Sequence, residues 1–275
     1  MTRLKETLRY QIERLVSGAN NEDYLQHYLY ANSKYQNRLR LNSHEFQSFS
    51  QCGQDGILSE IFRRIGTTNR FFVEFGVGDG LENNTVNLLV KGWIGAWIEA
   101  SNKNCKRIKN KFLFLINQQR LKLENAFITR DTINDLFKEL SVPPEFDVLS
   151  IDIDGNDYWV WDAIEGFTPR VVVIEYNPQF EPDVNWVMKY NSTTTWDGSG
   201  YFGASLKSLE LLGAKKGYHL VGCDFSGSDA FFVRKELTDG KFLAPFTAEN
   251  HFEPLRLFLI RKTGFPRNFG EFETV

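Results

Sequence analysis

The chain has 275 residues, of which 42% are hydrophobic, and its 32 basic and 35 acidic residues give a net charge of −3. This is the composition of an ordinary globular protein with a sizeable core. The near-balanced charge and the lack of a lysine or arginine block exclude a nucleic-acid partner bound through a broad basic face. The three cysteines are scattered singly, which excludes a disulfide framework or a thiolate zinc site. The sequence shows neither the apolar core of a signal peptide nor a run of roughly 20 apolar residues, so we expect a cytoplasmic protein that does not span a membrane.

The first 48 residues form an N-terminal extension with a helical pattern. Apolar residues recur at helical spacing over residues 3–16 and again around Leu25 and Leu29, so we predict two helices. Three roles remain open for them: a cap on the main domain, an arm that joins two copies into a homo-oligomer, or a lid over the substrate.

From about residue 50, short apolar runs alternate with helix-length segments. Candidate strands lie at residues 71–75, 94–99, 121–128, 147–153, 170–176, 218–223 and 230–235. Candidate helices lie between them, at residues 55–65, 83–91, 103–113, 131–140, 156–164 and 203–214. Asn102 and Asp131 are expected N-caps, and Gly66 and Gly92 are expected C-terminal stops. The alternation predicts a parallel sheet with helices on both faces.

The last two strands break this alternation. Only the residues DFSGSD join them, which is too short for a parallel crossover, so they must form an antiparallel hairpin. We therefore predict an α/β, Rossmann-like fold with a seven-strand, mostly parallel sheet, which is the layout of class I methyltransferases. The predicted domain covers residues 49–237, and the tail, 238–275, is expected to pack on it.

A glycine-rich turn follows the first strand directly. Glu74, Gly76, Gly78 and Gly80 form the pattern E-x-G-x-G-x-G. Glycines at such a turn let the backbone approach a ligand closely, and the following helix offers free N–H groups. The spacing fits the first motif of methyltransferases better than the dinucleotide fingerprint G-x-G-x-x-G. A tight turn without a ligand is the alternative.

An acidic residue ends the second strand. Glu99 lies 23 residues after Gly76, where a carboxylate can accept two hydrogen bonds from ribose hydroxyls. Nicotinamide-dependent enzymes use the same device, so Glu99 predicts an adenosine-type cofactor without choosing between the two. We expect Ala100, beside it, and Ala126, near the end of the third strand, to line the same cofactor.

Polar residues stand at the ends of the fourth and fifth strands: Asp152 and Asp154 at one, Glu175 and Asn177 at the other. They should converge where α/β enzymes bind ligands, and burying unpaired carboxylates is costly. In one interpretation Asp152, Asp154 and Glu175 are catalytic, with one of them acting as general base. In a second, Asp152, Glu175 and Asn177 hold Mg²⁺. In a third, some of these side chains only cap the next helix.

The chain resembles the FkbM-type S-adenosylmethionine-dependent methyltransferases over residues 48–237. The resemblance is carried by FSQCGQDGIL (49–58), FFVEFGVGDG (71–80), NTVNLLVKGWIGAWIEAS (84–101), DVLSIDIDGND (147–157), VVVIEYN (171–177), YFGASLKSLELLGAKKGYHLV (201–221) and SDAFFV (228–233). It implies a Rossmann-like seven-strand sheet and methyl transfer, often to a hydroxyl of a sugar or natural product. Many members carry D-x-E-G-x-E after the fourth strand, whereas this chain has shorter acids at Asp154 and Asp157. Gln54, in the first of these motifs, is expected to cap its helix or to reach the cofactor's amino-acid end.

A long connection, residues 178–202, follows the fifth strand and mixes aromatic with hydroxyl-bearing residues. Such loops in compact domains are usually functional, and this composition suits a sugar-like ligand, although it also suits a self-packed surface loop. We expect an S-adenosylmethionine-dependent O-methyltransferase acting on a sugar or glycan-like small molecule, with Mg²⁺ as an optional second cofactor. The alternatives are a nicotinamide-dependent oxidoreductase, a non-catalytic interaction module, and an N-methyltransferase, which the lack of an (N/D)PPY pattern disfavours.

Overall fold

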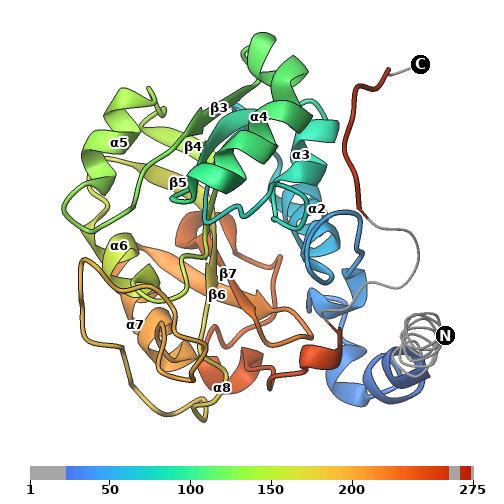
Figure 1. Ribbon diagram of the computed structural model, residues 1–275. Coiled ribbons are helices and arrows are strands. Elements are labelled where there is room, and N and C mark those ends of the chain that lie inside the picture. Colours follow the sequence, from blue (N-terminus) through green and yellow to red (C-terminus); the bar gives the residue numbers. More distant parts are fainter. Residues whose placement is uncertain (1–22, 260–266, 274–275) are drawn as a thin grey trace, which may run out of the picture.

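The computed structural model describes residues 23–259 and 267–273, so the helix expected over residues 3–16 lies outside the described residues. A seven-stranded sheet in the order β3-β2-β1-β4-β5-β7-β6 forms its centre (Figure 1). The strands are β1 (Phe71–Phe75), β2 (Ile94–Ile98), β3 (Leu121–Glu124), β4 (Glu145–Ile151), β5 (Thr168–Glu175), β6 (Tyr218–Cys223) and β7 (Asp229–Arg234).

The strand directions confirm the predicted fold. Strands β1 to β5 pair in parallel, whereas β7 runs antiparallel to both β5 and β6. Strand β7 is therefore the one strand of this sheet that runs against the other six. The strand order reverses at β1, which lies between β2 and β4, and α/β folds of this kind bind ligands in the crevice beside such a reversal.

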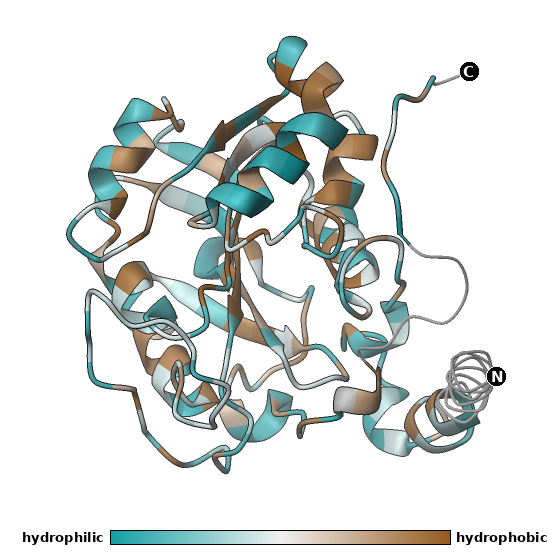
Figure 2. Cartoon of the chain, in the orientation of Figure 1, coloured by the Kyte–Doolittle hydropathy of each residue, from teal (hydrophilic) through white to brown (hydrophobic). Residues whose placement is uncertain are grey.

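Helices cover both faces of the sheet, as predicted. They are α2 (Gln54–Ile65), α3 (Val86–Val90), α4 (Asn102–Asn117), α5 (Ile133–Glu139), α6 (Asp157–Ala163), α7 (Leu206–Lys216) and the short α8 (Ala248–His251). Helices α2, α3 and α4 lie on one side and α5, α6 and α7 on the other (Figure 1). Each helix carries hydrophobic and hydrophilic residues side by side (Figure 2). Amphipathic helices of this kind bury one face on a sheet and leave the other in water.

Two hydrophobic cores result, one on each face of the sheet. Successive side chains of a strand point to opposite faces. In β1, Phe71, Val73 and Phe75 accordingly pack with α5, α6 and α7, while Phe72 packs with α2, α3 and α4. The strand ends are thereby held firmly between two layers, which is what a site built on those ends requires.

Several element boundaries differ from the sequence prediction. The N-cap of α4 is Ser101 rather than Asn102, because the Ser101 hydroxyl accepts a hydrogen bond from the backbone N–H of Asn104 at 3.3 Å. Helix α5 begins after Thr132 rather than Asp131. Gly66 does end α2, with a φ of 68°. Caps depend on which oxygen points at the free N–H groups, which residue type alone leaves open.

The N-terminal extension is joined to the C-terminal region by a buried ion-pair cluster. The second predicted helix is a short π-helical segment, η1 (Leu25–Leu29). Further along, the buried carboxylate of Glu253 accepts hydrogen bonds from Lys34 at 2.9 Å, Tyr35 at 2.7 Å and Arg256 at 2.9 Å. Within residues 23–259 and 267–273, no helix is both long and apolar enough to span a bilayer.

Candidate active site

The glycine turn leaves β1 in close contact with the backbone of β4. Gly76 has a φ of 64°, and its N–H donates to the carbonyl of Ile98 at 3.1 Å. A Cβ at Gly76 would lie 1.7 Å from the carbonyl oxygen of Asp152, so only glycine fits there. Gly76 is thus explained by packing between two strand ends and needs no ligand.

The other two glycines differ in what surrounds them. A Cβ at Gly80 would lie 3.0 Å from the Phe112 ring and 3.1 Å from Trp97, so Gly80 faces the core. Gly78 also has positive φ, at 57°, but a Cβ there would meet no atom of the described residues within 4 Å. Of the three predicted cofactor glycines, Gly78 is the one at which an added Cβ would point into open space.

Glu99 lies directly beside this open glycine. Its carboxylate accepts hydrogen bonds from the backbone N–H groups of Gly78 at 2.9 Å and Ser101 at 2.7 Å, and only 6% of the residue is exposed. Each carboxylate oxygen can accept a further bond. Ala100, next in the chain, is exposed, and the side chain of Asn125 donates to the carbonyls of Glu99 and Ala100. Two features found separately in the sequence therefore meet at the end of β2.

Glu74 serves the protein's own backbone. Its buried carboxylate accepts from the side chain of Asn83 at 2.6 Å, from the backbone N–H groups of Asn84 and Thr85, and from the Thr85 hydroxyl at 2.5 Å. Burial raises the pKa of Glu74, while these hydrogen bonds oppose the rise. The contacts explain why α3 begins at Val86, later than expected, because the preceding N–H groups point at Glu74.

Gln54 and Ala126 also lie among protein partners. The Gln54 amide donates to the carboxylates of Asp229 at 3.0 Å and Asp224 at 3.2 Å, and its oxygen accepts from the N–H of Cys52 at 2.8 Å. Ala126 is half-buried and packs against the core formed with α5, α6 and α7. Gln54 thereby joins the start of α2 to the acidic end of the sheet.

Three of the predicted acids do converge. Carboxylate oxygens of Asp152, Asp154 and Glu175 all lie within 4.8 Å of one another. In the part of the chain that the structure describes, the Glu175 Oε2 atom is buried and has no hydrogen-bond partner. Asp229, which the sequence analysis did not single out, stands opposite Glu175 in the antiparallel β5–β7 pair. The site is thus more acidic than expected.

The tight turn after β4 directs Asp154 toward this group. The carboxylate of Asp157 accepts from the backbone N–H groups of Ile153 and Gly155, each at 2.8 Å. Between them Asp154 adopts a φ of 54°, a conformation that residues other than glycine adopt rarely and at some cost in energy. Asp157, the first residue of α6, therefore bonds the backbone of the turn that precedes the helix, and the N-cap residue Asn156 makes no side-chain cap hydrogen bond. The two bonds to Asp157 hold the turn on either side of the strained Asp154.

Burial raises the pKa values of the acids at this site. Burial, followed by the charge of Asp229, raises the pKa of Asp152 well above its usual range, and burial with the charge of Asp152 does the same for Glu175. The pKa of Asp229 rises to about 7, through burial and the neighbouring Asp224. The charged neighbours that raise these pKa values are all carboxylates, so the site favours a proton or another cation.

Asn177 holds the loop that follows β5. Its amide group donates to the carbonyls of Gly200 at 2.9 Å and Phe202 at 3.0 Å, and its oxygen accepts from the N–H of Gln179 at 3.1 Å. These contacts close the two ends of the 178–202 connection. They also give Asn177 a role in shaping that connection, apart from any ligand.

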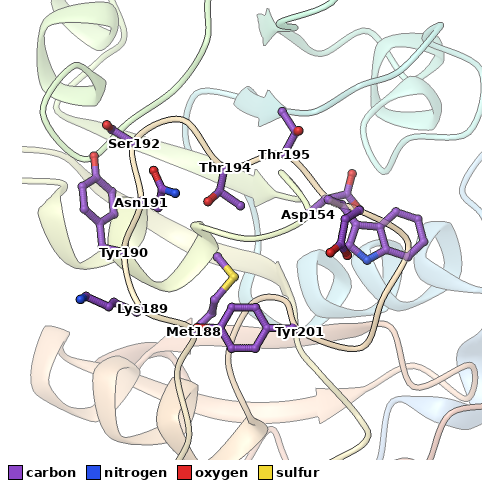
Figure 3. Close-up of a pocket in the computed structure, with 11 residues that line it drawn as sticks. Asp154, Met188, Lys189, Tyr190, Asn191, Ser192, Thr194, Thr195 and Tyr201 are labelled. Carbon is purple, nitrogen blue, oxygen red and sulfur yellow. The ribbon is translucent and has the colours of Figure 1, made fainter.

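A cavity of about 700 Å³ opens where this loop meets the acids. Its lining comes from the loop and from one acid of the β4 turn, and consists of Asp154, Met188, Lys189, Tyr190, Asn191, Ser192, Thr194, Thr195, Trp196, Asp197 and Tyr201. Figure 3 shows these side chains, with Asp154 and Tyr190 on opposite sides. Trp196 is 52% exposed and Tyr201 is 59% exposed. Asp154 therefore belongs to both the acidic group and the cavity wall.

The wall that carries Tyr190 is fastened to the loop after β3. The guanidinium of Arg130 lies 4.0 Å from the centre of the Tyr190 ring, and the Tyr190 hydroxyl bonds Asp131 at 3.3 Å. Trp159 of α6 contacts the same ring edge-on. A cation over an aromatic face and a T-shaped aromatic pair each stabilise such an arrangement modestly.

Comparison with known proteins gives distant structural similarities. No family model and no curated protein matches the chain. Among solved structures, it is similar to an O-methyltransferase from Bacillus cereus in complex with SAH, with 18% identity, a TM-score of 0.44, and coverage of 82% of this chain and 90% of that one. The N-terminal domain of EvdMO1 with SAH bound gives 12% identity, a TM-score of 0.41, and coverage of 69% and 80%.

A third similarity is to the methyltransferase domain of bacterial CtHen1-C, with 14% identity and a TM-score of 0.42 over 67% of this chain and 97% of that one. Identities and TM-scores as low as these do not assign an activity. The function therefore has to be argued from the residues of the site.

Proposed function

We propose that the protein transfers the methyl group of S-adenosylmethionine to a hydroxyl of a sugar or glycan-like small molecule. The observation that carries the proposal is the 2.9 Å hydrogen bond from the Gly78 N–H to the Glu99 carboxylate. It joins an open backbone turn to a carboxylate that can bind ribose hydroxyls, beside the reversal in strand order where nucleotide-like cofactors bind. Ala100 and the end of β3, with Ala126, would flank the adenosine.

Charge and topology favour S-adenosylmethionine over a nicotinamide dinucleotide. The usual dinucleotide-binding sheet has the order 3-2-1-4-5-6, whereas here the antiparallel β7 lies between β5 and β6. A pyrophosphate would also bring negative charge toward Asp152, Glu175 and Asp229. The positive sulfonium of S-adenosylmethionine would instead lower the cost of burying these carboxylates.

The acids at the strand ends can serve this reaction in two ways, as a base and in orienting the acceptor. When bound, S-adenosylmethionine would supply an electrophilic methyl group for the acceptor oxygen, and S-adenosylhomocysteine would be the leaving group. Glu175 or Asp152 in its ionised form accepts the hydroxyl proton, and the Glu175 Oε2 atom, which has no hydrogen-bond partner among the described residues, is free to take it. Asp154, shared by the acids and the cavity, orients the acceptor, and most of the acceleration comes from this positioning.

The cavity supports a sugar-like acceptor. Its volume of about 700 Å³ lies within the range of small-molecule sites. Exposed faces of Trp196 and Tyr201 can stack on the apolar face of a sugar ring, while the amide, hydroxyl and carboxylate groups around them can bond its hydroxyls. The Trp196 N–H already donates to the Ser199 carbonyl at 2.7 Å, which fixes the indole in place.

Mg²⁺ is a second way to neutralise the acids. Asp152, Asp154 and Glu175 offer oxygen atoms, the ligand type that Mg²⁺ prefers, and a bound ion would acidify the acceptor hydroxyl. The amide of Asn177, expected among the ligands, is committed to the 178–202 loop. This ligand set is therefore carboxylate only.

Calorimetric titration tests the proposal. We expect purified protein to bind S-adenosylhomocysteine with micromolar affinity and not to bind NAD. Glu99→Gln should weaken this binding, while Glu139→Gln, at the exposed end of α5, should leave it unchanged. Binding of NAD alone would favour the oxidoreductase, and a folded protein that binds neither ligand would favour a non-catalytic module. A heat of Mg²⁺ binding that is present in wild type and absent in Asp152→Ala would support the metal site.

A further inference from the structure

The C-terminal segment, residues 267–273, contacts two loops at the ligand-binding edge of the sheet. The guanidinium of Arg267 donates to the carbonyl of Ser50 at 2.9 Å and forms an ion pair with the carboxylate of Glu82. The Arg267 side chain is only 8% exposed, whereas that of Glu82 is 61% exposed. A single side chain thus connects the loop before α2 with the loop that follows the glycine turn.

One of the contacted loops continues the glycine turn, and the other is bonded to the start of α2. Glu82 lies between Gly80 of the glycine turn and Asn83, which donates to Glu74 at 2.6 Å. Ser50 lies in the loop whose backbone N–H groups bind Asp55, at the start of α2. A displacement of Glu82 would therefore be transmitted to the turn that carries the open Gly78, and Arg267 ties Glu82 to the loop at Ser50.

Aromatic packing holds the same segment behind the glycine turn. The ring of Phe269 stacks on Phe112 with a centroid distance of 4.4 Å and an interplanar angle of 21°. It also contacts Phe49 and Phe114, each at a centroid distance of 5.8 Å. Phe112 is also the ring nearest to the position that a Cβ at Gly80 would occupy, 3.0 Å away. The segment is thus a layer of the core that supports the turn from its closed side.

The burial of Arg267 indicates a positioning role. Taking a guanidinium out of water is costly unless it is paired. In the described part of the chain, the Arg267 Nε atom is buried without a hydrogen-bond partner, so the Glu82 ion pair and the Ser50 carbonyl carry the compensation. The two groups that compensate for the burial of Arg267 therefore include Glu82, in the loop after the glycine turn.

We propose that Arg267 is a positioning residue for the cofactor: by clamping Glu82 to the loop at Ser50, it holds the glycine turn in the conformation that binds the adenosine. The inference rests on the proposed methyltransferase function. Coupling between two sites is reciprocal, so cofactor binding must in turn stabilise the 267–273 segment. A purely structural role for Arg267 would produce no such reciprocity.

Two variants and one control test the clamp in the full-length protein. Arg267→Met keeps the length of the side chain and removes its charge, and Glu82→Gln removes the ion pair from the exposed side. Lys111→Met is the matched control, because Lys111 bonds Asn268 of the same segment at 3.4 Å but neither loop. We expect both clamp variants to raise the Kd for S-adenosylhomocysteine about tenfold, within the usual range of coupling. The Kd of the control should match that of wild type, and the variant that combines both clamp substitutions should lose no more affinity than either single variant.

Hydrogen exchange gives the second readout. S-adenosylhomocysteine should slow amide exchange over residues 267–273 in wild type, and this protection should be lost in Glu82→Gln, whose exposed position makes it the variant that tolerates substitution best. Unchanged affinity in folded Glu82→Gln, or no protection of the segment in wild type, would overturn the clamp while leaving the proposed function standing. Failure of wild type to bind S-adenosylhomocysteine would overturn the proposed function and the clamp with it.

Discussion

Substituting alanine for Gly78 should separate ligand binding from folding. A non-glycine residue at the left-handed φ of 57° costs roughly 1–2 kcal/mol. The added methyl group would meet no described atom within 4 Å, so no steric term adds to this. For a protein of this size, such a loss lowers the melting temperature by about 2–4 °C per kcal/mol. The methyl group would, however, occupy the space that we assign to the cofactor.

Gly76→Ala provides the contrast within the same turn. Its φ is similar, but the added Cβ would lie 1.7 Å from the carbonyl oxygen of Asp152, so β1 and β4 would have to separate. We expect a loss of more than about 4 kcal/mol, which is exceptional for one substitution, or failure to fold.

Calorimetry with S-adenosylhomocysteine and thermal unfolding followed by circular dichroism measure the two effects. Gly78→Ala should raise the Kd at least tenfold, equivalent to about 1.4 kcal/mol, with a small change in melting temperature. Wild-type affinity in Gly78→Ala would refute the assignment of the open space to the cofactor. Wild-type stability in Gly76→Ala would refute the packing argument.

Three other outcomes are expected. Asp147→Asn removes the negative charge that is paired with the buried Arg170 guanidinium, 2.7 Å away, and should lower the free energy of unfolding by about 3–5 kcal/mol in urea denaturation; a loss below about 1 kcal/mol would contradict this. Because the pKa of Asp229 is raised to about 7 in the folded state and unfolded aspartates titrate near pH 4, folding takes up a proton between these values. The melting temperature should therefore fall as the pH rises from about 4 to 7, and an equally steep fall in Asp229→Asn would argue against this assignment. Finally, deprotonation of the acidic group should favour binding of the sulfonium cation of S-adenosylmethionine. The affinity for S-adenosylmethionine relative to that for S-adenosylhomocysteine, whose sulfur is uncharged, should therefore rise with pH. An unchanged ratio of affinities in wild type, or the same rise in Asp152→Asn, would count against the charge argument.

The parts of the site that depend on local geometry were predictable from the sequence. A glycine turn after a buried strand and an acid at the end of the next strand must meet, because parallel neighbours end at the same edge. Gly78 and Glu99 do so, and Asp152, Asp154 and Glu175 converge for the same reason. The seven strands were also identified, since apolar runs of strand length between helical segments are typical of a sheet covered on both faces.

The parts that depend on distant pairing were not predictable. Asp229 reaches the site because β7 runs backwards beside β5, which puts its first residue rather than its last at the functional edge. Nothing local to Asp229 signals this. Likewise, residue type alone could not tell that Glu74 bonds the N–H groups ahead of α3, or that Asn177 bonds the far end of its own loop. The same amide and carboxylate groups would suit a ligand equally well.

The contact between Gly76 and the backbone of Asp152 has a consequence for how such a protein can change over evolution. Because the glycine turn and the acidic strand end meet through main-chain atoms, neither can be remodelled without displacing the other. The 178–202 connection is restricted less, since it is bonded to the turn after β4 and to α6 through the side chains of Asn156 and Trp159, which donate to the carbonyls of Asn191 and Met188. Under the proposed function, new acceptor preferences are therefore most readily acquired by exchanging that connection, with the glycine turn and the acidic strand end left intact.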